Sequence, residues 1–139
     1  MDRISAEKRS KNMQRIRAFG TAPEVVVRHL VCQVGFRSRY RLHNHKLPGR
    51  PDVVFPTMRK IIFVHGCFWH SHQRCKLAHT PKSRLGYWKP KLQRNKMRDR
   101  RNASELRREG WRVLIVWECQ TRNSARQVQQ AIAHFLKSR

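Results

Sequence analysis

The chain has 139 residues, which is enough for one domain with a modest core and not for two. Its 32 Lys and Arg residues against 8 Asp and Glu residues give a net charge of +24, which favours a polyanionic partner, most simply nucleic acid. No apolar run approaches the roughly 18 residues of a membrane helix. A polar N-terminus without a secretory signal predicts a cytosolic protein, in which four cysteines argue against a disulfide framework and leave a metal site open.

Capping residues and apolar spacing predict helices and strands in mixed order along a single domain, 1–139, with a basic N-terminal segment over 1–19. The predicted helices cover residues 5–18, 22–34, 88–109 and 123–136. The predicted strands cover residues 36–42, 52–55, 60–64 and 111–117. The strand–helix–strand unit from 60 to 117 predicts two parallel strands joined by a crossover helix, and the fold class is therefore α/β.

Two consequences follow from this order of elements. The turn at 56–59 makes its flanking strands antiparallel, which places Asp52 opposite Val64 or His65 at one edge of the sheet. The two parallel strands end on the same side of the sheet, so Cys67 and Cys119 are expected to lie close together although 52 positions separate them.

A metal site is predicted in the irregular segment 66–87. Cys67, His72 and Cys75 lie within nine residues, and Cys119 completes a Cys3His set of the kind that binds structural Zn²⁺. His70 is the alternative imidazole ligand, and the spacing favours His72 only modestly. Cys32 differs, because it lies in an apolar helical stripe and is interpreted as a small buried hydrophobic residue.

Asp52, Val64, His65 and His70 suggest phosphodiester chemistry. Asp52 offers a carboxylate and Val64 a backbone carbonyl, which are oxygen ligands suited to Mg²⁺. His65 and His70 are candidate general acids or bases, because imidazole titrates near neutral pH.

Two further carboxylates fall on inward helical stripes. Asp99 is spaced by seven from Leu92 and from Leu106, and His65 is its predicted partner; the alternative is a surface pair with a neighbouring arginine. Glu24 is either a capping-box residue, which the sequence favours, or a carboxylate near the active site.

Large aromatic residues lie in a basic environment at Phe68, Trp69, Tyr87 and Trp88, which suits base stacking or wedging between base steps. Ordinary core packing is the alternative, and it is the assignment made for Trp111 and Trp117. The basic runs at 8–17, 82–101 and 107–112 are expected to contact phosphates.

Three blocks together resemble the very short patch repair endonucleases, the Vsr family. They read LPGRPD at 47–52, FVHGCFWH at 63–70 and GWRVLIVWEC at 110–119, and RSKNM at 9–13 resembles the N-terminal segment of the family. The match runs in order along nearly the whole chain.

The resemblance implies a restriction-endonuclease-like fold, a mixed β-sheet flanked by helices. It implies a Mg²⁺-dependent nick on the 5′ side of the thymine in T:G mismatches, which arise when 5-methylcytosine deaminates. The substrate would be double-stranded DNA bound by a monomer, in a bacterial cytoplasm, with downstream repair proteins as further partners.

The resemblance also implies roles for individual residues. Asp52 and the Val64 carbonyl match the Mg²⁺ ligands, and His65, His70 and Asp99 match the active-site side chains. The structural Zn²⁺ ligands match Cys67, His72, Cys75 and Cys119. The residues that match the DNA wedge are Phe68, Trp69 and Trp88, with Met13 entering from the other groove. The rival interpretations are a zinc-stabilised, non-catalytic nucleic-acid-binding module and a nuclease of the same fold with another DNA substrate.

Overall fold

The computed structural model describes residues 22–138 except 43, 45 and 79–82, so the predicted helix 5–18 and Met13 lie outside the described residues. The helices are α2 (Ala22–Gln33), α3 (Leu85–Arg108), α4 (Glu118–Asn123) and α5 (Ala125–Lys137), with short 3-10 helices at Arg37–Arg39 and Lys76–Ala78. The strands are β1 (Arg41–Leu42), β2 (Val53–Phe55), β3 (Lys60–His65) and β4 (Arg112–Trp117).

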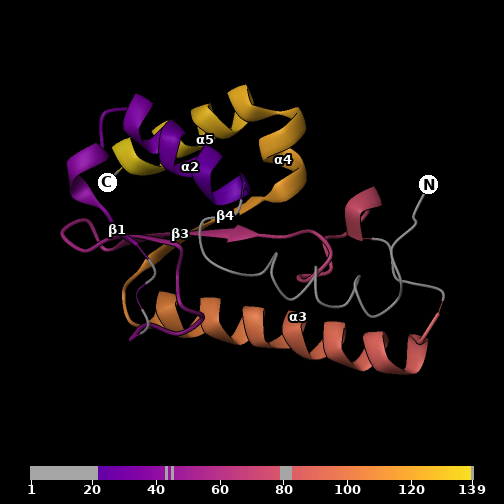
Figure 1. The fold of residues 1–139 in the computed structure, drawn as a ribbon. Coiled ribbons are helices and arrows are strands. Elements are labelled where there is room, and N and C mark those ends of the chain that lie inside the picture. Colours follow the sequence, from indigo (N-terminus) through magenta and orange to yellow (C-terminus); the bar gives the residue numbers. More distant parts are fainter. Residues whose placement is uncertain (1–21, 43, 45, 79–82, 139) are drawn as a thin grey trace.

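The four strands form one mixed sheet in the order β1-β2-β3-β4. The first two pairings are antiparallel, and β3 pairs with β4 in parallel after the crossover through α3. Helix α3 covers one face of the sheet, while α2, α4 and α5 cover the other (Figure 1). The prediction of a mixed α/β sheet flanked by helices is confirmed.

The side chains of β3 alternate between the two faces, as a pleated strand requires. Ile62 packs in a cluster with α2 and α5, whereas Ile61 and Phe63 pack with Leu106 of α3. A strand buried on both faces explains the continuous apolar run in its sequence. The same alternation carries His65, the last residue of β3, to the side of the sheet that α3 covers.

The register between β2 and β3 differs from the predicted one. Phe55 pairs with Lys60 and Val53 with Ile62, so continuing the ladder by one step would bring Asp52 beside Phe63, and not opposite Val64 or His65. Pro56 has no N–H to donate, so the ladder closes at Phe55, and the four residues of the predicted turn, 56–59, all lie outside it.

The element boundaries differ in three further places. Of the predicted strand 36–42, only Arg41–Leu42 joins the sheet, because a 3-10 turn occupies Arg37–Arg39. Helix α3 begins at Leu85, three residues earlier than predicted. The predicted helix 123–136 corresponds to α5, and α4 directly before it was not predicted; Ser124, whose φ of −141° is not helical, separates the two. Among the described helices, none is long and apolar enough to cross a membrane.

Candidate active site and metal centre

Asp52 directly precedes β2 and turns its carboxylate toward the end of β3. Its Oδ2 accepts a 2.7 Å hydrogen bond from the backbone N–H of Val64. Shielding from water raises the pKa of Asp52 to about 7; the Val64 N–H opposes this rise and the negative charge of Glu24 adds to it. A divalent cation would hold such a carboxylate ionised, so the position suits an oxygen ligand of a hard cation such as Mg²⁺.

Glu24 lies in the first turn of α2, where the sequence allows a capping role or a place near the active site. Its negative charge contributes to the raised pKa of Asp52. One or two carboxylates are the usual protein ligands of Mg²⁺. This charge effect agrees with a place near the active site, for which the inward stripe shared with Val27 and Val31 is the sequence signal. The capping role involves Thr21, which lies outside the described residues.

Two histidine rings stack at the end of β3. The imidazoles of His65 and His70 are parallel, with centroids 3.9 Å apart and an interplanar angle of 6°. The Nδ1 of His70 lies 2.6 Å from Oδ2 of Asp99, which leaves Nε2 as the nitrogen for proton exchange. Burial, and then the charge of His70, lower the pKa of His65 to about 3, so its ring is neutral at physiological pH.

The helical stripe of α3 correctly places Asp99 inward, but its partner was wrongly predicted. The carboxylate bonds to His70 and not to His65. His65 is fixed on a strand beneath the His70 ring, whereas His70 lies in the following loop and can turn its edge toward α3. His65, His70 and Asp99 thus form a cluster whose ring nitrogens and carboxylate oxygen lie close together. The side chains of His70 and Asp99 are 28% and 23% exposed.

Cys67, His72, Cys75 and Cys119 form a second group, and all their potential ligand atoms lie within 4.8 Å of one another. Nδ1 of His72 is 3.6 Å from Sγ of Cys67 and 3.5 Å from Sγ of Cys119. A tetrahedral Zn²⁺ with ordinary Zn–S and Zn–N bonds requires an S–N separation of about 3.6 Å. The donor set and its spacing therefore fit such an ion, with His72 and not His70 as the nitrogen donor.

Cys67 and Cys119 are far apart in the chain, and they lie close together as the crossover geometry predicted. The backbone N–H of Cys119 donates to Sγ of Cys67 over 3.4 Å. Burial raises the pKa of the Cys67 thiol to about 12, so this group holds its proton unless a cation displaces it.

Cys32 lies outside the cluster as expected, but it is half-buried and not buried, at the side of α2 near Tyr40.

A short loop connects the two groups. Ser71 has a φ of 51°, and this left-handed turn sends His70 toward Asp99 and His72 toward the cysteines. A second left-handed residue, Arg74, with a φ of 54°, separates His72 from Cys75. Non-glycine residues adopt this conformation only where the surrounding structure holds them in it.

An aromatic patch adjoins this site, formed by Phe68, Trp69, Tyr87 and Trp88. Neighbouring rings meet edge to face, with centroids 4.9 to 5.9 Å apart. The ammonium of Lys91 lies 5.4 to 5.8 Å from the centroids of the last three rings. Tyr87 is 47% exposed, and the patch presents aromatic surface beside a cation, which suits contact with nucleic-acid bases.

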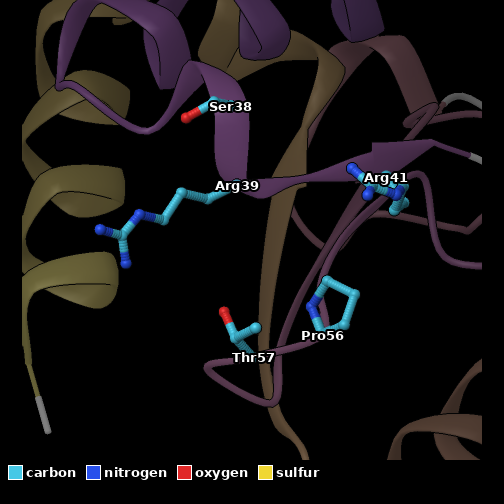
Figure 2. A pocket seen from close by; sticks show the side chains of 5 residues that line it. All are labelled: Ser38, Arg39, Arg41, Pro56 and Thr57. Carbon is cyan, nitrogen blue, oxygen red and sulfur yellow. The ribbon is translucent and has the colours of Figure 1, made fainter.

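The hollow of about 340 Å³ at the β2–β3 turn is a separate feature, at the end of β3 opposite His65. It is lined by Ser38, Arg39, Arg41, Pro56 and Thr57. Figure 2 shows the Arg39 side chain extending away from Arg41, so the two guanidinium groups do not converge on one point. None of the predicted site residues lines it.

Two tryptophans were assigned to the core from the sequence. Trp111 does pack against the cluster beneath α3, with Val113 and Ile115. Trp117 is half-buried and belongs to neither core cluster of the described residues; its ring contacts His65 and His72 instead. The sequence signal for this location is that Trp117 lies two residues before the predicted zinc ligand Cys119.

Comparison with known proteins agrees with this geometry. The family model described as DNA mismatch endonuclease Vsr matches residues 1–77. The type II nicking enzyme V.XorIIP of Xanthomonas oryzae is 50% identical over 86% of this chain and 85% of its own length. The DNA mismatch endonuclease Vsr of Escherichia coli is 43% identical over 93% of this chain and 81% of its own length. The type II nicking enzyme V.NmeAIP of Neisseria meningitidis is 40% identical over 89% and 86%. The chain therefore belongs to the DNA mismatch endonuclease Vsr family, a family of DNA endonucleases.

Proposed function

We propose that this endonuclease nicks the T strand of duplex DNA on the 5′ side of the thymine in a T:G mismatch, in a Mg²⁺-dependent reaction. Such mismatches arise by deamination of 5-methylcytosine, and the enzyme acts as a monomer on cytoplasmic, nucleoid DNA, ahead of downstream repair proteins. The observation that carries the proposal is the arrangement of Asp52 and the His70–Asp99 pair at one sheet edge, beside the aromatic patch.

The chemistry needs a cation ligand and a proton acceptor close together. Asp52 and the backbone carbonyl of Val64 would hold Mg²⁺, which supplies charge stabilisation to the scissile phosphate when bound. His70 accepts the proton of the attacking water at Nε2, because Asp99 engages Nδ1 and stabilises the protonated ring. His65 stays neutral and supports the His70 ring from beneath by stacking.

The second cluster has a structural role in this proposal. Cys67, His72, Cys75 and Cys119 hold Zn²⁺, which ties the loop after β3 to the start of α4. The loop carries His70 as well as Phe68 and Trp69, so closing it with a metal fixes catalytic and DNA-contacting groups together.

Mismatch selection rests on deformation of the duplex. Phe68, Trp69 and Trp88 wedge between base steps, and Met13, outside the described residues, enters from the other groove. A T:G pair stacks less well than a matched pair, so opening it costs less free energy. The basic side chains of the chain, which carries +24, neutralise the phosphates around this point.

The test is a nicking assay with duplexes that differ only at one pair, T:G, T:A or C:G, with each strand labelled separately, in Mg²⁺ and in EDTA. We expect a single nick in the T strand of the T:G duplex that requires Mg²⁺. Salt-sensitive binding without cleavage of any duplex would favour the non-catalytic binding module. Cleavage that ignores the mismatch would retain the nuclease chemistry and overturn the proposed substrate.

Asp99→Asn is expected to lower the single-turnover nicking rate by about 10²- to 10⁴-fold, because the amide does not stabilise protonated His70. The dissociation constant for T:G duplex should stay unchanged, since Asp99 acts on a ring and not on DNA. Glu105→Gln, an exposed carboxylate on the same helix, is the matched control and should nick at the wild-type rate. A variant at Asp99 that keeps the wild-type rate would remove the pair from the mechanism.

Trp88→Ala is expected to weaken binding of the T:G duplex by about tenfold to a hundredfold, the loss typical of one stacked base. Binding of the matched T:A duplex should change less, because it is not wedged open. Gel-shift titrations of both duplexes give the two dissociation constants. Met97→Ala, which removes an exposed apolar side chain elsewhere on α3, should leave both dissociation constants unchanged. Equal weakening on both duplexes by Trp88→Ala would argue against a wedge.

A further inference from the structure

Trp117 lies between the two clusters described above. It is the last residue of β4 and pairs in register with His65, the last residue of β3. Its indole stacks on the His72 ring with centroids 4.0 Å apart and an interplanar angle of 9°. Its edge-to-face contact with His65 has a centroid distance of 5.2 Å and an angle of 79°. One side chain thus touches a histidine of each cluster.

The contacts form a continuous series of rings. His72 stacks on Trp117, Trp117 contacts His65, and His65 stacks on His70. The series ends at the hydrogen bond from His70 to Asp99. Because each contact is close and nearly parallel or perpendicular, we expect a displacement of one ring to shift the next.

A hydrogen bond holds the backbone of Trp117 in place. Its backbone N–H donates to Oε1 of Gln120 over 2.9 Å, which anchors the point where β4 passes into α4. The apolar core clusters of the described residues do not include Trp117. Trp111, at the other end of the strand, does pack with one of these clusters. The two tryptophans therefore have different surroundings: Trp111 packs in the apolar core, whereas Trp117 contacts two imidazole rings.

We propose that Trp117 is a positioning residue that holds the His65–His70 stack in its catalytic geometry and couples it to the cysteine–histidine cluster. This inference rests on the proposed function, because the reaction that Trp117 would support is the nicking step. His70 must place Nε2 toward the attacking water, and a misplacement of about 1 Å in such a group lowers a rate by about 10².

The test compares Trp117→Leu, Trp117→Phe and the matched control Trp111→Leu. We expect Trp117→Leu to lower the single-turnover nicking rate tenfold to a hundredfold, with unchanged zinc content and unchanged affinity for T:G duplex. Trp117→Phe, which keeps an aromatic ring, should restore most of the rate. Trp111→Leu should lower the melting temperature but keep the nicking rate, because it alters core packing far from the rings.

A second readout does not depend on activity. Histidine side-chain ¹H–¹⁵N correlation spectra report the environment of each imidazole, and His70 has no ring contact with Trp117 in the described structure. In Trp117→Leu the His70 resonances should nevertheless move, and in Trp117→Phe they should return toward wild-type positions. Should Trp117→Leu fail to fold, Trp117→Met replaces it with the same expectations.

Failure of this inference is distinguishable from failure of the proposed function. A wild-type protein that does not nick would overturn the proposed function, while the His70 resonances would still test the coupling. Unmoved His70 resonances, or wild-type nicking by Trp117→Leu, would overturn the positioning role. Equal rate losses in Trp117→Leu and Trp111→Leu that follow their melting temperatures would do the same, because they would show a purely structural effect.

Discussion

Asp52→Asn is expected to lower nicking of a T:G duplex by at least about 10³-fold, because a bound cation contributes several kcal/mol of charge stabilisation and each 1.4 kcal/mol is tenfold in rate. Asparagine keeps an oxygen that can accept the N–H of Val64, so the local fold should survive. Affinity for the duplex should not fall. Single-turnover kinetics across a Mg²⁺ titration, together with gel-shift binding, measure both quantities.

The control for this substitution is Glu105→Gln, which removes an exposed negative charge from the same protein without touching the site. It separates the role of the Asp52 carboxylate from a general effect of net charge on DNA binding. Nicking by Asp52→Asn at more than a tenth of the wild-type rate would remove Asp52 from the cation site. Glu24, the carboxylate whose charge acts on Asp52, would then be the next residue to substitute.

Cys119→Ser is expected to abolish zinc binding and to lower the melting temperature by roughly 10 °C or more. Opening a loop that the metal closes is expected to cost about 3 kcal/mol of stability. At about 4 °C per kcal/mol in a chain of this size, that cost lowers the melting temperature by about 12 °C. Nicking should fall as well, because the loop that Zn²⁺ closes carries His70. Elemental analysis of the purified protein and thermal unfolding monitored by circular dichroism give the two results.

Cys32→Ser is the matched control, since Cys32 is a free cysteine that lies outside the cluster. It should retain one zinc ion per chain and a melting temperature close to that of the wild type. A wild-type protein that is purified without zinc and is fully stable would contradict the structural metal. Zinc retained in full by Cys119→Ser would remove this cysteine from the ligand set.

Much of the fold could be predicted from local pattern. The apolar run of β3 predicted a buried strand, and the stripe of Leu92, Asp99 and Leu106 correctly gave the inward face of α3. The crossover rule placed Cys67 beside Cys119 without any knowledge of the intervening loop. These predictions succeeded because each depends on a period or a handedness that the backbone imposes everywhere.

Predictions that needed exact spacing succeeded less often. The β2–β3 register differs from the predicted one because the ladder closes at Phe55, and this changed the residue that lies beside Asp52. The carboxylate nevertheless reaches Val64 through its side chain. Hydrogen bonds made by side chains tolerate a change of register that backbone pairing does not, since a side chain spans several ångströms.

The amino-acid sequence by itself determined the chemistry available to this protein: a carboxylate at Asp52, an imidazole at His70, the donor set that Cys67 begins, and the family to which the chain belongs. Only the tertiary structure decided that Asp99 bonds to His70 and not to His65, and that Trp117 contacts both clusters. Residue identity sets which protons and ions a group can bind. Which groups meet depends on the packing of α3 and the loop after β3 against the strand ends, and no local pattern records that packing.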